Sequence, residues 1–281
     1  MTDTQPSMSA RLELPARAAS GMVLGIAAVA ALVSGGIPFA AFVAVAAIAA
    51  LREWHRLVNA GQLAYEMIPT GLAMIAVVWL ASAPSSVDRA LIAIGLGAGG
   101  AALLAASRRT PKLWPMPWHA FGAVYIGLPV LALVLLRDSP HGAAIVGGVF
   151  VAVWTADTGA LLIGGAIGGP KLAPNLSPNK TWAGLLGGTL AAGIAEALYG
   201  GILGGSMLGA AVFGIFLALA GHCGDLFESW VKRQFHAKNT GRMIPGHGGV
   251  LDRIDSVLFA APACAMLIYL TGFNPLYNPA P

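Results

Sequence analysis

Long runs of apolar residues, separated by short polar segments, extend through most of the 281-residue chain. A helix needs roughly 20 largely apolar residues to cross the hydrocarbon core of a bilayer. Hydrophobic residues make up 57% of the sequence and charged residues 10%, whereas soluble domains carry about 25% charged residues. The composition excludes a disordered chain and an ordinary soluble enzyme, and it predicts an all-α, polytopic membrane helical bundle.

We expect a single integral membrane domain over residues 1–281 with about nine transmembrane helices. The candidate spans are 18–34, 36–51, 67–83, 89–106, 117–136, 142–166, 182–203, 205–224 and 254–272. The first also resembles a signal peptide, because Arg11 and Arg17 precede it. The second span follows at once after a Gly-Gly-Ile-Pro turn, so we interpret the first as a retained span.

The basic residues indicate how these spans are oriented. With a cytoplasmic N-terminus, 14 of the 16 lysines and arginines fall on cytoplasmic segments. Arg89 and Arg137 fall on the other side, in agreement with the positive-inside rule. The net charge of +4 therefore serves membrane topology, and we expect no nucleic-acid partner.

Acidic residues gather at the predicted cytoplasmic edge of the later spans. Asp225 ends the eighth span, and Asp252 and Asp255 begin the ninth on one helix face. Asp157 lies deeper, roughly 14 Å from the cytoplasmic end of the sixth span. Clustered carboxylates repel one another unless a proton or cation intervenes, and oxygen ligands suit magnesium. The alternative is that each acid pairs with a nearby base, such as Arg253.

Two polar segments next to these acids carry candidate phosphate ligands. Ser177, Lys180 and Thr181 precede the seventh span, and lysine and hydroxyl groups at a helix N-terminus favour phosphate. The stretch between the eighth and ninth spans adds Ser229, Lys232, Arg233, Lys238, Arg242, His247 and Arg253. Clustered bases there can hold a polyphosphate, and the neighbouring acids its magnesium. A helix cap and a solvated loop remain the alternatives.

Residues 229–256 closely resemble the signature of phosphatidate cytidylyltransferases, also called CDP-diacylglycerol synthases: SWVKRQFHAKNTGRMIPGHGGVLDRIDS. The resemblance extends upstream to GDLFES at 224–229 and to SPNKTW at 177–182, and it is specific over residues 150–260. One position departs from the pattern, since the family usually has aspartate where this chain has Asn239. The amide of Asn239 brings no charge and cannot act as a base.

The resemblance implies an enzyme of phospholipid synthesis that transfers a cytidylyl group from CTP to phosphatidic acid, giving CDP-diacylglycerol and pyrophosphate. It implies Mg²⁺ as the cofactor, with a monovalent cation as a candidate companion. It also implies a bacterial inner-membrane protein whose active site faces the cytoplasm, with a homodimer as one option.

The family signature assigns roles to individual residues. Asp225, Asp252 and Asp255 hold the metal and act in catalysis together with Lys232, and Asp157 is a further candidate ligand. The substrate-binding candidates are Ser177, Lys180, Thr181, Ser229, Arg233, Lys238, His247 and Arg253. Residues 1–140 then contribute N-terminal spans, and 141–281 contribute the catalytic spans and loops.

Three other functions compete with this hypothesis. A membrane transporter is suggested by nine spans, glycine-rich helices and Glu196, which is either a core acid or part of an ion path. The polar residues gather at one surface, however, and do not follow a path across the membrane. The second alternative is another lipid-phosphate transferase, such as a CDP-alcohol phosphatidyltransferase. The sequence does not support it, because the DGxxAR pattern characteristic of that family is absent. A diverged, inactive relative is the alternative suggested by Asn239.

Overall fold

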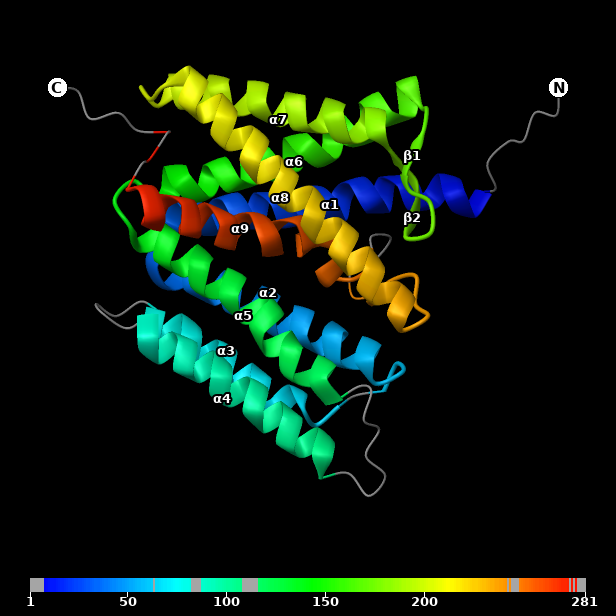
Figure 1. The fold of residues 1–281 in the computed structure, drawn as a ribbon, viewed down its shortest axis with the longest axis vertical. Coiled ribbons are helices and arrows are strands. Elements are labelled where there is room, and N and C mark those ends of the chain that lie inside the picture. The colour runs from blue at the N-terminus through cyan, green and yellow to red at the C-terminus, as the bar shows by residue number, and fades with distance from the viewer. Residues whose placement is uncertain are drawn as a thin grey trace.

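The computed structural model of this protein describes residues 8–62, 64–81, 87–107, 116–241, 243, 248–272, 274 and 276. Over these residues the chain forms nine α-helices and one two-stranded sheet, shown in Figure 1. The elements are α1 (Met8–Ser34), α2 (Gly36–Val58), α3 (Met67–Ala81), α4 (Val87–Ala106), α5 (Met116–Asp138), α6 (Gly142–Ile167), β1 (Lys171–Ala173), β2 (Ser177–Thr181), α7 (Trp182–Ile202), α8 (Met207–Gln234) and α9 (Leu251–Thr271).

The helices confirm the predicted all-α, multi-pass membrane architecture. Seven of the described helices are long and apolar enough to cross a membrane, and each coincides with a predicted span. Two described apolar helices are shorter, namely α3 and the Gly21–Ser34 part of α1. The crossing of the bilayer by all nine helices stays a prediction, because α3, with 15 residues, falls below the length that a simple span requires.

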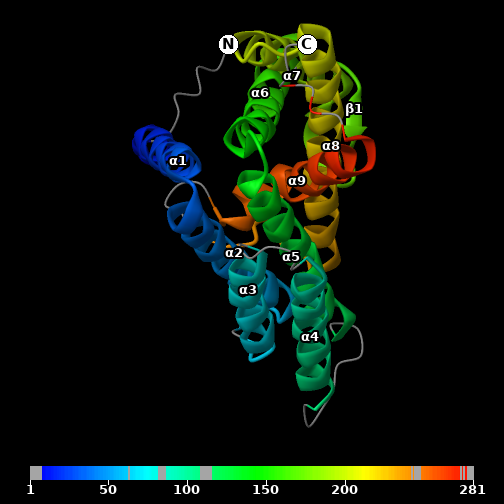
Figure 2. The same ribbon diagram turned by 90° about the vertical axis from the view of Figure 1, so that its left-hand side faces the viewer.

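The helices are arranged in three groups, as Figures 1 and 2 show from two directions. The α3–α4 pair lies on one side and α6, α7 and α8 lie on the other, with α2, α5 and α9 between them. β1, β2 and the connection from α8 to α9 share one end of the molecule, whereas the turn between α7 and α8 lies at the opposite end. The alternation of ends agrees with the predicted topology.

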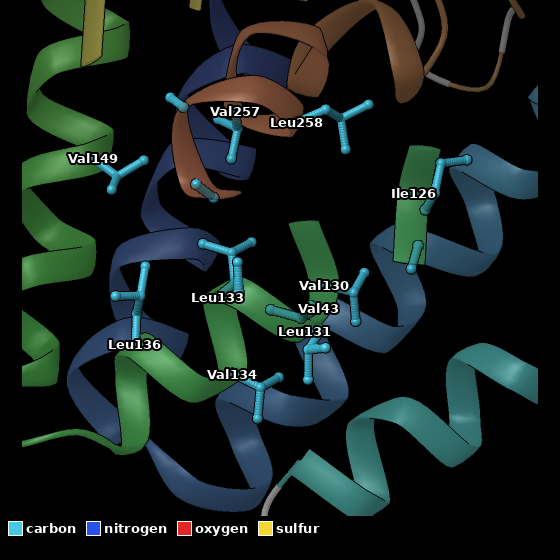
Figure 3. Packing of buried hydrophobic residues seen from close by; sticks show 14 of the residues in the cluster. Val43, Ile126, Val130, Leu131, Leu133, Val134, Leu136, Val149, Val257 and Leu258 are labelled. Atoms are coloured by element: carbon cyan, nitrogen blue, oxygen red, sulfur yellow. The ribbon is translucent and has the colours of Figure 1, made fainter. Parts of the chain in front are cut away.

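The middle group is held together by a continuous apolar core. Val43 of α2, Ile126 and Val130 of α5, and Val257 and Leu258 of α9 are all buried and face one another in Figure 3. Buried apolar side chains of α6 join the same cluster. In a bilayer such packing stabilises helix association through close contact, since lipid tails are as apolar as these side chains. The core thereby fixes α9 against the N-terminal helices.

Small residues bring α6 and α7 into very close contact. Gly159 and Gly188 face each other across the interface, where a Cβ atom added to Gly159 would lie 3.1 Å from the Cα atom of Gly188. A Cβ atom added to Gly188 would collide with the carbonyl oxygen of Ala156 and lie 3.0 Å from the Cβ atom of Ala160. Glycine at these positions lets the two backbones approach as small residues do in membrane helix pairs.

Two segments differ from the sequence-based expectation. The eighth predicted span ends at 224, yet α8 continues to Gln234 because residues 225–234 contain no glycine or proline. The segment before the seventh span, expected as a loop, contains an antiparallel β-hairpin that pairs Lys171 with Thr181 and Ala173 with Ser177. The register shifts between these pairs, because β2 has two more residues than β1 between them, so β2 contains a bulge between Ser177 and Thr181.

We predict that Gly188→Val lowers the free energy of unfolding by about 1–3 kcal/mol, because the larger side chain forces α6 and α7 apart. Thermal unfolding in detergent measures the effect. Gly95→Val is the matched control, since a Cβ atom at Gly95 of α4 has nothing within 4 Å. Equal unfolding temperatures for the two variants would contradict the close packing of α6 on α7.

Candidate active site

A polar cavity opens at the end of the molecule that carries the β-hairpin. Its volume is about 1140 Å³, which exceeds the usual range of roughly 300–1,000 Å³ for a small-molecule site. α6, α7, α8, α9 and the hairpin all contribute to its walls. The ionisable residues in its lining are Asp157, Lys171, Lys180, His222, Asp225, Lys232, Lys238, Asp252, Arg253 and Asp255. The cavity is therefore large enough for a nucleotide together with a lipid headgroup.

The extension of α8 beyond the apolar span places four polar or charged side chains on one face of the helix. Asp225 lies three and four residues before Glu228 and Ser229, and Lys232 lies four and three residues after them, so all four share one side of the helix. Glu228 is buried, with 1% of its side chain exposed, and it forms an ion pair with Lys232. Burial of such a charge is costly unless it has a partner, which Lys232 supplies.

Asp252, at the start of α9, connects α8 to the preceding loop. Lys232 donates to its Oδ1 atom at 3.0 Å, and the backbone amide of Gly249 donates to its Oδ2 atom at 2.9 Å. The backbone amide of Thr240 lies 3.3 Å from the same Oδ2 atom. Lys232 thus stands between two carboxylates, those of Glu228 and Asp252, and is held by both.

The β-hairpin places a second lysine, Lys180, next to Asp225. Lys180 lies in the bulged part of β2 and forms an ion pair with Asp225 of α8. Thr181 follows it as the N-cap of α7, where its hydroxyl oxygen accepts a hydrogen bond from the Gly184 amide at 3.1 Å. The Nε–H group of Arg233 donates a hydrogen bond to the carbonyl oxygen of Leu176 at 3.3 Å and so attaches the hairpin to α8.

Three carboxyl groups lie close enough to share one cation. One oxygen atom from each of Asp225, Glu228 and Asp255 lies within 4.8 Å of the others. The Oε1 atom of Glu228 is buried and has no hydrogen-bond partner among the described residues. Hard divalent cations prefer oxygen ligands of this kind, and such an ion offsets the repulsion between neighbouring carboxylates. The donor set therefore fits Mg²⁺.

The structure brings most of the predicted site residues to one place. The predicted residues that line the cavity are Asp157, Ser177, Lys180, Thr181, Asp225, Ser229, Lys232, Lys238, Asp252, Arg253 and Asp255. Arg233 lies outside this lining and holds the hairpin instead. His247 lies outside the described residues. Asn239, which replaces the usual aspartate of the family, also lines the cavity.

The structure brings forward two further acids. The sequence counted Glu228 among the acids of residues 224–255 that could hold magnesium but did not place it in the predicted metal group, and it gave Glu53 no role. Glu228, and not Asp252, completes the three-carboxylate group. Its spacing from Asp225 would have suggested this, had α8 been expected to continue. Glu53 of α2 reaches the loop before α9 and accepts a hydrogen bond from the amide of Leu251 at 2.9 Å. The contact joins residues 198 positions apart, and no local sequence signal indicates it.

A membrane-embedded helical bundle with an acid- and lysine-lined cavity defines the class of this protein, and comparison with known proteins supplies the family. Residues 15–271 match the cytidylyltransferase family. A phosphatidate cytidylyltransferase of Brucella suis is 39% identical over 254 residues, which cover 85% of each chain. A protein of the same name from Pseudomonas aeruginosa is 39% identical over 171 residues, covering 57% of this chain and 61% of the relative.

The chain therefore belongs to the cytidylyltransferase family. The result confirms the resemblance found in the sequence and favours a nucleotidyltransferase over a transporter. A third relative, the phosphatidate cytidylyltransferase of Rickettsia bellii, is 37% identical over 159 residues, which cover 54% of this chain and 68% of the relative.

We predict that Thr181→Val lowers the free energy of unfolding by about 1 kcal/mol, because valine keeps the shape of threonine but cannot cap α7. Thr181→Ser, which retains the hydroxyl group, is expected to restore the stability. Thermal unfolding in detergent compares the two variants. An unchanged unfolding temperature in Thr181→Val, combined with weaker CTP binding, would instead assign the hydroxyl group to the substrate.

Proposed function

We propose that this protein transfers the cytidylyl group of CTP to phosphatidic acid and releases pyrophosphate and CDP-diacylglycerol. One observation carries the proposal: a cavity lined by both carboxylates and lysines lies at the end of a bundle of apolar helices. The family and the 39% identity to the Brucella suis enzyme support the same reaction. The site joins a water-soluble polyanion to a lipid, and its position at the end of the helices suits both substrates.

The reaction needs no nucleophilic side chain. A phosphate oxygen of phosphatidic acid forms a bond to the α-phosphorus of CTP, the bond from that phosphorus to the β-phosphate oxygen breaks, and pyrophosphate leaves. The protein must bring two anions together and stabilise the charge that develops on the transferring group. We assign this work to Lys180, Lys232, Lys238 and Arg253, whose side chains line the cavity.

Lys232 and Lys180 are suited to binding phosphate oxygens because each is already directed by a carboxylate. Lys232 is fixed between Glu228 and Asp252, and Lys180 is paired with Asp225. A lysine that is positioned before the substrate arrives loses less side-chain freedom when the triphosphate binds. Asp252 is then a positioning residue for Lys232, a role that explains its contacts better than direct metal ligation does.

We propose that Asp225, Glu228 and Asp255 hold a Mg²⁺ ion, with Asp157 as a further candidate ligand. Asp157 lines the same cavity and accepts a hydrogen bond from Ser256. When bound, Mg²⁺ supplies charge neutralisation of the triphosphate and polarises the α-phosphorus. A monovalent cation beside it stays a prediction.

We further propose that the cavity faces the cytoplasm of a bacterial inner membrane. Described basic residues gather on the hairpin and around the α8–α9 connection, on the side that the positive-inside rule assigns to the cytoplasm: Lys171, Lys180, Lys232, Arg233, Lys238 and Arg253. CTP is then available on the same side as the cavity. The homodimer stays a prediction.

The first test is the conversion of labelled CTP into a lipid-soluble product. Protein in detergent with phosphatidic acid and Mg²⁺ is expected to form labelled lipid, and none is expected with labelled ATP or without phosphatidic acid. Asp252→Asn is expected to abolish turnover in a folded protein, because the neutral amide no longer balances Lys232. A folded, CTP-binding wild-type protein without product would indicate an inactive relative. Absence of CTP binding as well would favour the transporter.

The metal assignment is tested with Mn²⁺ as a paramagnetic probe. Glu228→Gln is expected to weaken Mn²⁺ binding by at least about 10-fold, because a ligand charge is lost from the carboxylate group. Glu196→Gln is the matched control, since Glu196 of α7 is also buried but does not belong to the three-carboxylate group. Electron paramagnetic resonance of free Mn²⁺ measures both affinities. Equal affinities would exclude Glu228 as a ligand.

A further inference from the structure

A carboxylate of the second helix holds the segment that leads into α9. Glu53 lies near the C-terminal end of α2 and is only 2% exposed. Its Oε2 atom accepts hydrogen bonds from the Leu251 amide at 2.9 Å and from the Thr240 hydroxyl at 3.4 Å. Thr240 belongs to the connection between α8 and α9, and Leu251 is the first residue of α9, so one buried acid binds both the connection and the start of α9.

The same connection also binds Asp252, and one residue, Thr240, donates hydrogen bonds to both acids. The hydroxyl group of Thr240 donates a hydrogen bond to Glu53, and its backbone amide donates one to Asp252. The backbone amide of Gly249 donates a hydrogen bond to Asp252 at 2.9 Å. The backbone amide of Leu251, which precedes Asp252, donates one to Glu53. The two carboxylates therefore hold the same segment, and Thr240 connects them through its hydroxyl group and its backbone amide.

The close approach of the segment to Glu53 depends on glycine. A Cβ atom added to Gly241 would lie 2.6 Å from the Cδ atom of Glu53, and one added to Gly249 would lie 2.5 Å from its Oε2 atom. Because contacts this short force a neighbour to shift, a side chain at either position would displace the Glu53 carboxylate from its present place. The packing leaves Glu53 little freedom to move.

We propose that Glu53 is a positioning residue for cytidylyl transfer. It fixes Thr240 and the first turn of α9, so that Asp252 keeps Lys232 directed into the cavity. The inference rests on the proposed function, because Lys232 acts there on the phosphates of CTP. Loss of the Glu53 carboxylate leaves the buried Leu251 amide without its acceptor and allows the segment to move. Displacements of about 1 Å in a group that orients reactants can cost on the order of 100-fold in rate.

The test measures kinetics in the full-length protein in detergent with CTP and phosphatidic acid. Glu53→Ala is expected to lower kcat by about 10- to 100-fold, with the KM for CTP changed by less than about threefold. Glu53→Gln, which retains one acceptor oxygen, is expected to fall between Glu53→Ala and the wild type. Glu196→Gln is the matched buried control and is expected to keep wild-type kcat.

Two further measurements separate positioning from a general loss of stability. Hydrogen exchange of residues 248–256 is expected to quicken in the Glu53 variants, while exchange in α6 and α7 stays unchanged. Thr240→Val removes the other partner, and the double variant Glu53→Gln/Thr240→Val is expected to be no slower than the slower single variant. If Glu53→Ala does not fold, Glu53→Gln and Thr240→Val still provide the comparison.

Three outcomes would overturn the inference. One is a wild-type kcat per folded molecule in Glu53→Ala. Another is a lowered unfolding temperature with unchanged exchange at 248–256, which indicates a purely structural role. The third is strict additivity of Glu53→Gln and Thr240→Val. A folded wild-type protein that forms no product contradicts the proposed function instead, and hydrogen exchange together with CTP affinity then decides whether Glu53 orders this segment.

Discussion

Two lysine side chains form ion pairs with three carboxylates at the cavity, and the surrounding structure depends on these ion pairs. Lys232 joins Glu228 of α8 to Asp252 of α9, and Lys180 joins the hairpin to Asp225. Charges removed from bulk water are costly unless they are paired. Because the pairs connect α8, α9 and the hairpin, the contacts that neutralise the acids also hold the walls of the cavity in place.

The rest of the fold gives these ion pairs a rigid frame. Close contact between glycine-rich faces of α6 and α7 sets one wall, and Arg233 attaches the hairpin through the carbonyl oxygen of Leu176. The N-terminal helices support the opposite side, where Trp118 of α5 contacts both Trp54 of α2 and Trp230 of α8. Glu53 extends this support to the start of α9, so the N-terminal helices do more than anchor the chain in the bilayer.

Much of the candidate site could be predicted from the sequence because its residues lie in two continuous polar segments between apolar spans. Asp225, Asp252, Asp255, Lys180 and Lys232 were all expected near the same membrane edge, and all line one cavity. The third carboxylate of the metal group differs between the sequence, which suggests Asp252, and the structure, which groups Glu228 with Asp225 and Asp255. The third member depends on the continuation of α8 beyond the apolar span, and hydropathy carries no information about where a helix ends once it leaves the bilayer.

The sequence by itself determined the membrane class, the helical spans, the family and the acids and lysines of the site, since each depends on composition, periodicity or a local motif. Only the tertiary structure decided which carboxylates share a cation, how the β2 bulge presents Lys180, and that Glu53 binds the segment before Asp252. The Glu53 contacts join residues 187 and 198 positions apart. Such pairings arise from the packing of helices against one another, and helix packing leaves no signal in the neighbouring residues of the chain.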